Sequence, residues 1–486
     1  MQRSVIVYVL SLAASVYGYS CSSKVQTVKT VEAPAPYGVL PDAKQVEWQQ
    51  METYMFVHFG PNTFTNEEWG SGEENPEVFN PTALDCRQWA EIAKNAGMKG
   101  IIITAKHHDG FCLWNSKYSE HTVANSRWKD GKGDVLRELS DACREFGIKF
   151  GVYLSPWDRN HKTYGTPEYN TVFANMLEEV LGNYGEVFEQ WFDGANGEGP
   201  NGKKQVYDWA LFNGVVRKMQ PNAMIFSDVG PDCRWIGNEK GIAGETNWSR
   251  LDTEGFTPGL GAPASSALNS GQTDGSAWMP GEADVSIRPG WFYSAETDNK
   301  VKSLSKLLDI YYTSVGRNAN LLLNVPPNTI GRIHPNDSTR LMEFRAALDK
   351  IFKHNLIKNA KVSVSQVRGN SDLFSASGLI DGHYDTYWAT DDEVLSGEII
   401  IENNEEITFN RLLLQEYIPL GQRVKRFSVD YWDGTQWQNI DNQTTIGYKR
   451  ILCFPKIRAN KIRVNIEESL ACPTISELSI YLDDIQ

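Results

Sequence analysis

Residues 187–195 read Val187-Phe-Glu-Gln-Trp-Phe-Asp-Gly-Ala195, an apolar and aromatic run that ends abruptly in a carboxylate and a glycine. A short run rich in Val, Phe and Trp is typical of a β-strand, and Gly-Ala suits a tight exit into a loop. If this strand belongs to a parallel barrel, its carboxyl end opens onto the face that carries the active site in such folds. Asp193 would then lie at the floor of a pocket beside Trp191. The alternative interpretation is an aspartate that only caps the turn after the strand.

Strands and helices alternate on both sides of this stretch. Apolar runs predict strands at 54–60, 100–106, 149–155, 187–193, 223–228, 284–291 and 319–325. Helical periodicity and capping signals predict helices at 81–97, 134–146, 168–184, 204–219, 299–314 and 336–353. Such alternation indicates an α/β fold, either a (β/α)8-like barrel or a doubly wound sheet. The length of the region and the polar residues at successive strand ends favour a barrel spanning residues 46–356.

The helical period disappears after about residue 357. Short alternating strands follow, as at 426–432 and 461–466, and turn signals such as Asp433-Gly434 separate them. This pattern predicts an all-β sandwich domain at residues 357–486.

The N-terminus resembles an export signal. One positive charge, Arg3, precedes an apolar segment of suitable length, so we expect residues 1–21 to be removed. Small residues precede Cys21, which makes lipid attachment at this cysteine one alternative and cleavage without a lipid the other. Residues 22–45 are rich in Ser, Lys, Thr and Pro and predict a tether. We therefore expect an exported protein, periplasmic or at the cell surface, with membrane anchoring through the lipid in the first alternative.

The composition narrows the range of partners. A formal net charge of −14 argues against nucleic acid, which requires a basic surface. The chain has 15 Trp and 20 Tyr, whose flat rings suit stacking on sugars, although a large core would also account for them.

Polar and aromatic side chains gather at the predicted strand ends: His58, His107, His108, Tyr153, Trp157, Trp191, Asp193 and Trp291. A neutral imidazole donates from one nitrogen and accepts at the other, which suits the recognition of hydroxyl groups. Adjacent histidines in an extended segment point to opposite sides, so His107 and His108 would chelate a metal poorly. We therefore expect neither a metal nor another cofactor.

Cleavage of a glycosidic bond requires a second carboxyl group besides Asp193. Glu239, in the segment Arg234-Trp-Ile-Gly-Asn-Glu239, is the better candidate, and Glu245 is the competitor. Both occupy a loop-like stretch after the fifth predicted strand. An apolar setting beside Trp235 would raise the pKa of Glu239 and keep it protonated as a general acid.

Seven segments, in order between about residues 45 and 350, closely resemble the retaining α-L-fucosidases: Phe56-Val-His-Phe-Gly60, Glu68-Trp69-Gly70, Ala105-Lys-His-His-Asp-Gly-Phe111, Gly151-Val-Tyr-Leu-Ser-Pro-Trp157, Trp191-Phe-Asp-Gly194, Gly237-Asn-Glu239 and Ser286-Ile-Arg-Pro-Gly-Trp-Phe-Tyr293. The resemblance implies a barrel exo-glycosidase with Asp193 as nucleophile. It also implies that fucose hydroxyls are held by the residues at five matching positions, which are His58, Glu68, Trp69, His107 and His108. The acid/base position varies in this family, and its motif context favours Glu239.

The resemblance therefore implies retaining release of terminal α-L-fucose from fucosylated oligosaccharides or glycoconjugates. The segments around Asp193 and Trp291 look like the branch of the family that prefers α-1,3/1,4 linkages. Two alternatives are a glycosidase acting on another sugar and a catalytically inactive, sugar-binding surface lipoprotein.

The C-terminal region resembles the discoidin-type (coagulation factor 5/8 type C) module. The matching segments are Gly378-Leu-Ile-Asp-Gly382, Thr386-Tyr-Trp-Ala-Thr390, Asp430-Tyr-Trp-Asp-Gly434 and Ile475-Ser-Glu-Leu-Ser-Ile480. Such modules often bind sugars through loops at one end, and some carry a structural calcium. Packing of the module against the barrel, without any ligand, is the alternative.

Overall fold

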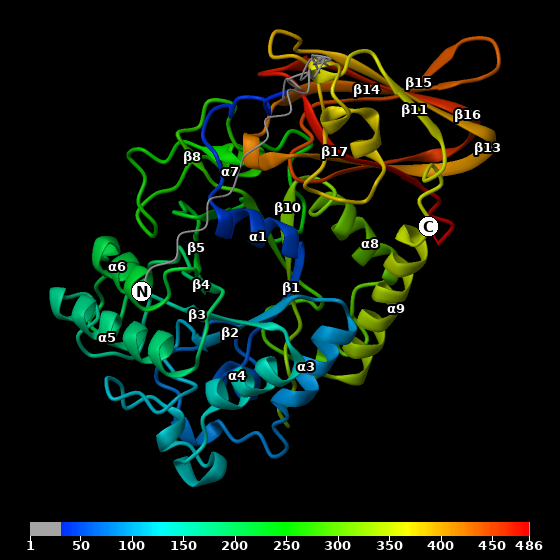
Figure 1. Cartoon of the computed structure of the whole chain (residues 1–486). Coiled ribbons are helices and arrows are strands. Elements are labelled where there is room, and N and C mark those ends of the chain that lie inside the picture. The colour runs from blue at the N-terminus through cyan, green and yellow to red at the C-terminus, as the bar shows by residue number, and fades with distance from the viewer. Residues whose placement is uncertain (1–30, 486) are drawn as a thin grey trace, which may run out of the picture. The chain divides into compact units, whose positions relative to one another are not determined.

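The computed structural model describes residues 31–485. Eight parallel strands form a closed barrel in the order β1-β10-β9-β6-β5-β4-β3-β2 (Figure 1). Their bounds are β1 Thr53–Val57, β2 Gly100–Lys106, β3 Lys149–Leu154, β4 Glu189–Trp191, β5 Met224–Ser227, β6 Cys233–Trp235, β9 Gly281–Ser286 and β10 Ala319–Asn324. The predicted α/β barrel is therefore confirmed.

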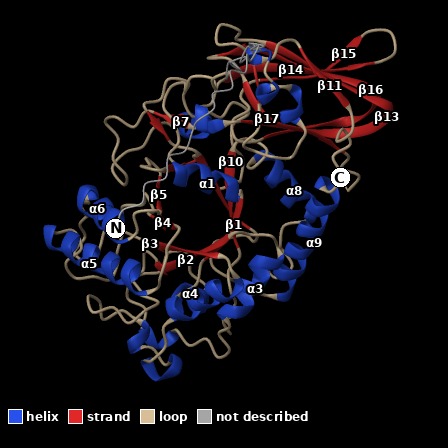
Figure 2. Cartoon of the chain, viewed as in Figure 1, coloured by secondary structure: helices blue, strands red, loops and turns tan. Residues whose placement is uncertain are grey.

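Helices surround the ring of strands (Figure 2). They are α2 Pro61–Thr65, α3 Cys86–Asn95, α4 Val135–Phe146, α5 Pro167–Asn183, α6 Trp209–Met219, α7 Ser265–Ser270, α8 Leu304–Thr313 and α9 Pro335–Phe352. A further helix, α1 Ala43–Met51, contacts β5 and β10, and its Trp48 indole donates to Glu189 inside the barrel at 2.8 Å. Among residues 31–485, no helix is both long and apolar enough to cross a lipid bilayer.

The sequence analysis did not predict one of the barrel strands, β6. Strand β6 lies within the stretch that we expected to be a loop before Glu239, and it has only three residues with an arginine in the middle. Arg234 is fully buried, and its guanidinium donates to the carbonyls of Leu268 and Trp248 and to the side chain of Asn247. Because these partners are distant in sequence, no local sequence pattern predicts the strand.

Several other predicted elements begin or end elsewhere; strand β1 ends at Val57 rather than 60, strand β4 covers only Glu189–Trp191, and helix α8 begins at Leu304 rather than 299. Helix α3 begins at Cys86 rather than near residue 81, because the Asp85 carboxylate accepts the Gln88 amide at 3.0 Å and caps the helix there. Helix α6 begins at Trp209 rather than 204, with Asp208 as its cap. Strand β9 ends at Ser286, not 291, since Pro289 has no amide hydrogen with which to continue a ladder.

The C-terminal part is an antiparallel sheet domain with the strand order β12-β17-β13-β16-β14-β15, and β11 also pairs with β13. The strands are β11 Lys361–Val364, β12 Trp388–Ala389, β13 Gly397–Glu416, β14 Val424–Trp432, β15 Trp437–Gln443, β16 Arg450–Ser469 and β17 Thr474–Tyr481. Two register shifts interrupt the pairing of the long strands β13 and β16. The strands enclose an apolar core of their own, which includes Ile399, Leu412, Phe427, Val464 and Leu478. The predicted change to an all-β domain is thus confirmed.

The barrel and the sheet domain are joined by hydrogen bonds. Asn318, just before β10, accepts the Tyr448 amide at 2.8 Å and donates its own amide to the Lys449 carbonyl at 2.9 Å. A short strand pair, β7 Arg250–Leu251 with β8 Ala277–Trp278, lies in the long segment between β6 and β9. The hydrogen bonds of Asn318 show that the sheet domain packs against the barrel, and sugar binding by its loops stays a prediction.

The predicted export signal and Cys21 lie outside the described residues. Of the predicted tether, the part that is described contacts the sheet domain: the Tyr37 amide donates to the Leu420 carbonyl at 3.0 Å, and Arg423 donates to the Ala35 carbonyl at 2.7 Å. Helix α1 begins at Ala43, inside the range expected to be tether, because the Asp42 carboxylate caps it at the Gln45 amide.

Candidate active site

A cavity of about 330 Å³ lies at the carboxyl ends of the barrel strands. Its walls contain all but one of the predicted site residues, together with several that we did not predict. The lining residues are Phe56, His58, Glu68, Trp69, His107, His108, Tyr153, Trp191, Asp193, Gly194, Ala195, Phe226, Asp228, Trp235, Glu239, Asp284 and Trp291. The structure therefore brings Asp193 and Glu239 to one cavity.

Asp193 follows β4 by two residues and is held by three neighbours. Its Oδ1 accepts the Ala195 amide at 2.7 Å, and its Oδ2 accepts the Tyr153 hydroxyl at 3.1 Å. The Nε2 atom of His108 lies 3.7 Å from the same Oδ2. The Asp193 side chain is 26% exposed and lines the cavity, and its contacts with Ala195, Tyr153 and His108 fix its orientation. A carboxylate placed in this way can attack a carbon atom held above it.

His108 is neutral, and its hydrogen bonds define its tautomer. Burial lowers its pKa to about 4, although the charge of Asp193 opposes this. Its Nδ1 lies 2.8 Å from the Ser155 hydroxyl, which itself donates to the Trp157 carbonyl. Nδ1 must therefore carry the hydrogen, and Nε2 is an acceptor beside Asp193. A ligand hydroxyl between these two acceptors could donate to either of them.

The same logic applies to His58. Burial lowers its pKa to about 3, and its Nδ1 lies 2.9 Å from Oδ1 of Asn324. The amide nitrogen of Asn324 donates to Ser286 and to the Trp291 carbonyl, so Oδ1 is the acceptor and His58 carries its hydrogen on Nδ1. Its Nε2 is thus available to a ligand hydroxyl.

His107 packs between these two histidines. Its ring stacks on Tyr153, with a 17° interplanar angle and centroids 5.6 Å apart, and burial lowers its pKa far below the usual value. Among residues 31–485 no hydrogen-bond partner is found for its buried Nδ1. In the same part of the chain, no group of three or more His, Cys, Asp or Glu side chains has the arrangement of a metal site.

Glu239 follows β6 and lines the cavity as an exposed residue. Burial raises the pKa of its carboxyl, and the negative charge of Asp193 adds to the increase. A raised pKa favours the protonated form that a general acid requires. Glu245, in contrast, lies outside the cavity with a side chain that is 68% exposed and paired with Arg317. The structure thus places only the first of our two candidates in the site.

Glu68 and Trp69 form the rim. Both carboxylate oxygens of Glu68 accept the Trp291 amide, at 2.8 and 3.1 Å. Burial raises the pKa of Glu68, and hydrogen bonds from the amides of Trp291 and Phe292 lower it. The Trp69 side chain is 59% exposed and leaves an aromatic face beside the cavity mouth.

Trp191 and Trp157 were both predicted as site residues, but only Trp191 lines the cavity. The ring of Trp191 stacks on that of Phe226 with centroids 4.1 Å apart, and its indole donates to the buried Glu282 at 2.7 Å. Trp157 does not line the cavity, contrary to our expectation. Its indole is turned away to donate to the Glu198 carbonyl at 3.0 Å, and its ring supports that of His108 with centroids 4.8 Å apart.

Two carboxyl groups of the cavity were missed. Burial and the charge of Asp193 raise the pKa of Asp228 to about 6, and its Oδ1 has no partner among residues 31–485. Asp284 accepts the Trp235 indole at 2.8 Å, and burial raises its pKa well above the usual value. Asp228 ends a strand that we predicted, so its position at a strand end was the signal that could have identified it. Asp284 lies inside a strand, and no comparable signal marks it.

Comparisons with known proteins agree with this architecture. Residues 34–350 match the family model described as Alpha-L-fucosidase, and residues 360–478 match the F5/8 type C domain. The chain is 42% identical over 455 residues to Alpha-L-fucosidase 1 of Arabidopsis thaliana, covering 93% of this chain and 89% of that protein.

Solved structures show the same similarity. A glycoside hydrolase 29 family member from an unknown rumen bacterium is 45% identical with a TM-score of 0.82, and the match covers 93% of this chain and 79% of that one. A glycoside hydrolase 29 fucosidase of Ruminococcus gnavus in complex with fucose is 36% identical with a TM-score of 0.85, covering 93% and 97%. The chain therefore belongs to the α-L-fucosidase family of glycoside hydrolases and carries a C-terminal F5/8 type C domain.

Proposed function

We propose that this protein is an exo-acting, retaining glycosidase that releases terminal α-L-fucose from oligosaccharides or glycoconjugates, with a preference for α-1,3/1,4 linkages. The observation that carries the proposal is the presence of Asp193 and Glu239 in one cavity whose lining also includes three histidines and four tryptophans. Its volume of about 330 Å³ is near the lower end for ligand pockets, roughly 300–1,000 Å³, and suits one terminal sugar.

The proposed reaction has two steps. Asp193 attacks the anomeric carbon and forms a C–O bond to it, while the bond to the departing oxygen breaks and Glu239 gives its proton to that oxygen. Water then attacks the same carbon, Glu239 takes the proton, and the bond to Asp193 breaks to release the sugar. Two inversions at one carbon give net retention. This mechanism requires the two carboxyl groups to be roughly 5 to 5.5 Å apart.

The histidines and Glu68 supply the contacts to the sugar hydroxyls in this proposal. Neutral His58 and His108 each present an acceptor Nε2, and the Glu68 carboxylate is held at the rim by Trp291. Trp69 offers an exposed aromatic face at the mouth, where the remainder of the glycan would lie.

The location of the protein is part of the proposal. The sequence of residues 1–21 supports export to the periplasm or cell surface, and Cys21 would carry a lipid if the signal is of the lipoprotein type. Mass spectrometry of the mature N-terminus would distinguish lipidated Cys21 from a simple cleavage product.

A panel of fucosylated oligosaccharides, with linkage-resolved product analysis and NMR detection of the anomer that is released first, tests the proposal. We expect α-L-fucose, and we expect Asp193→Ala to lose turnover and to recover part of it with azide or formate. Normal hydrolysis by this variant would exclude Asp193 as nucleophile. Release of another sugar, or of none, would favour the alternatives of a different glycosidase or an inactive sugar-binding protein.

A further inference from the structure

The backbone of Trp291 connects two of the side chains that we place against the sugar. Its amide donates to both carboxylate oxygens of Glu68, at 2.8 and 3.1 Å. Its carbonyl accepts the side-chain amide of Asn324 at 2.8 Å, and Oδ1 of Asn324 accepts the Nδ1 hydrogen of His58 at 2.9 Å. The main chain of one residue therefore determines how Glu68 and His58 face the cavity.

Trp291 lies in a loop, residues 288–293, whose two ends are joined by side chains. The guanidinium group of Arg288 lies over the ring of Tyr293, 4.9 Å from its centroid. Its Nη1 donates to Asp298 at 2.9 Å, and Asp298 also accepts the Tyr293 hydroxyl at 3.2 Å. Arg288 and Tyr293 thus share one carboxylate, and Trp291 lies between them in the chain.

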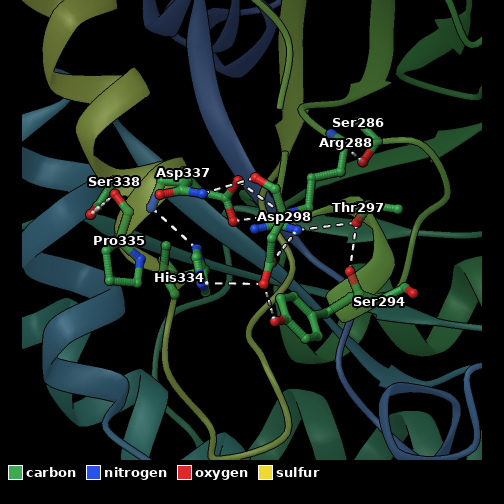
Figure 3. A network of polar contacts seen from close by, with 12 residues as sticks. Ser286, Arg288, Ser294, Thr297, Asp298, His334, Pro335, Asp337 and Ser338 are labelled. Carbon is green, nitrogen blue, oxygen red and sulfur yellow. Dashed lines mark hydrogen bonds and ion pairs between the residues drawn. The ribbon is translucent and has the colours of Figure 1, made fainter. Parts of the chain in front are cut away.

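The same arginine fixes the loop to helix α9. Arg288 is buried, and its Nε donates to both carboxylate oxygens of Asp337 at 2.8 and 2.9 Å (Figure 3). Asp337 lies in the first turn of α9 and is fully buried. A buried guanidinium with two carboxylate partners has few alternative positions, because moving it would leave a buried charge unpaired. We refer to Arg288, Asp298 and Asp337 as the anchor.

The loop also packs directly on the histidines of the cavity. The ring of Trp291 lies on that of His58 with centroids 5.0 Å apart. The buried ring of Phe292 contacts His58 and His107, with centroids 5.4 and 5.1 Å away. Because side chains in a close-packed interior cannot shift independently, a displaced loop would move Glu68 and His58 as well.

We propose that Arg288 is a positioning residue for sugar binding: through the loop that it anchors, it holds Glu68 and His58 in the orientation that receives the sugar hydroxyls. The inference rests on the proposed function, because Glu68 and His58 are sugar contacts in that mechanism. Arg288 itself does not line the cavity, so it acts through the residues that the loop holds.

The test is Arg288→Lys, which keeps the positive charge but removes the planar fork that reaches two carboxylates. Arg411→Lys is the matched control. The guanidinium of Arg411 lies 4.7 Å from the ring centroid of Tyr312 and donates to Asp483 at 2.7 Å, and Asp483 accepts the Tyr312 hydroxyl at 2.9 Å. This arrangement repeats that of Arg288, and none of its three residues lines the cavity.

Binding of L-fucose is measured by calorimetry, at a temperature where urea unfolding shows each variant to be folded. We expect Arg288→Lys to weaken binding by at least about tenfold, the equivalent of one lost hydrogen bond to a charged group. Arg411→Lys should bind L-fucose as the wild type does. Unchanged binding by Arg288→Lys, or equal weakening in the two variants, would overturn the inference.

A double variant shows whether Arg288 acts through the sugar contacts. In a Glu68→Ala background one of the two contacts is already absent, so Arg288→Lys should weaken L-fucose binding by a smaller factor than in the wild type. An equal factor in both backgrounds would overturn the inference.

A milder pair of variants decides the question if Arg288→Lys does not fold. Tyr293→Phe removes only the hydroxyl that donates to Asp298, and Tyr312→Phe removes the equivalent hydroxyl at Asp483. We expect weaker L-fucose binding in Tyr293→Phe than in Tyr312→Phe, and equal binding would overturn the inference. The proposed function fails separately, and is recognised by a wild-type protein that neither binds L-fucose nor cleaves an aryl α-L-fucoside.

Discussion

Comparing Gly290→Ala with a control glycine variant should separate the stability lost through backbone strain from the activity lost through a change in the cavity. Gly290 has φ of +79°, a conformation that side chains rarely adopt, and it directly precedes Trp291. A Cβ atom built on it would lie 2.2 Å from Oε1 of Glu68 and 3.2 Å from its Cδ. The added methyl group and the Glu68 carboxylate cannot both keep their places, so Glu68 must move off the Trp291 amide.

The size of the effect follows from these contacts. The left-handed backbone conformation costs an alanine about 1–2 kcal/mol of stability. Displacing Glu68 removes a hydrogen bond between a charged group and its partner, worth about 1.5–3 kcal/mol. If Glu68 binds a sugar hydroxyl in the transition state, losing that contact lowers kcat/KM by roughly 10- to 150-fold, at about 1.36 kcal/mol per factor of ten.

Gly147→Ala supplies the matched control. Gly147 ends helix α4 with φ of +68°, and no atom lies within 4 Å of a Cβ built there. Gly147→Ala should therefore lose only the backbone cost of about 1–2 kcal/mol in urea unfolding, and Gly290→Ala should lose more, because it also displaces Glu68 from the Trp291 amide. Only Gly290→Ala should lose activity on an aryl α-L-fucoside at a temperature where both variants are folded. The reasoning would be refuted by wild-type kcat/KM for Gly290→Ala, or by equal loss of activity in the two variants.

Three further predictions concern the acid, the anchor and pH. Glu239→Gln should lose roughly 10²–10⁴-fold on poor leaving groups and much less on aryl fucosides, whereas Glu245→Gln stays near wild type because its carboxyl is exposed outside the cavity; the opposite order in a leaving-group series would reassign the acid. Asp337→Ala leaves the guanidinium of Arg288 buried without its main partner and should cost about 3–5 kcal/mol in urea unfolding; a loss below about 1 kcal/mol would show that the anchor is not needed. Burial holds the pKa of His108 at about 4, below the roughly 6.5 of an unfolded histidine, so the unfolded chain protonates first and stability falls as pH decreases from about 6.5 to 4. His108→Gln should flatten that part of a Tm-against-pH curve, and an unchanged slope would contradict this.

Several features could be predicted from the sequence because their causes are local. An apolar run ending in Asp193, or in the histidines at 107 and 108, identifies a strand and what stands at its end, since period and composition are properties of adjacent residues. The barrel then follows from alternation, because parallel strands joined by helices bring their carboxyl ends to one face. The cavity accordingly contains most of the residues selected in this way.

Strand β6, the position of Glu239 and the orientation of Trp157 depend on tertiary contacts and could not be predicted from the sequence. Strand β6 exists because Arg234 is satisfied by carbonyl and amide groups from residues 247, 248 and 268, and its position beside β9 places Glu239 in the cavity. The indole of Trp157 points away because a carbonyl 41 residues further along accepts it. Each of these outcomes depends on hydrogen bonds between groups far apart in the chain. Burying a polar group is unfavourable unless it is hydrogen-bonded, so the free energy of burial depends on partners that only the folded protein brings close.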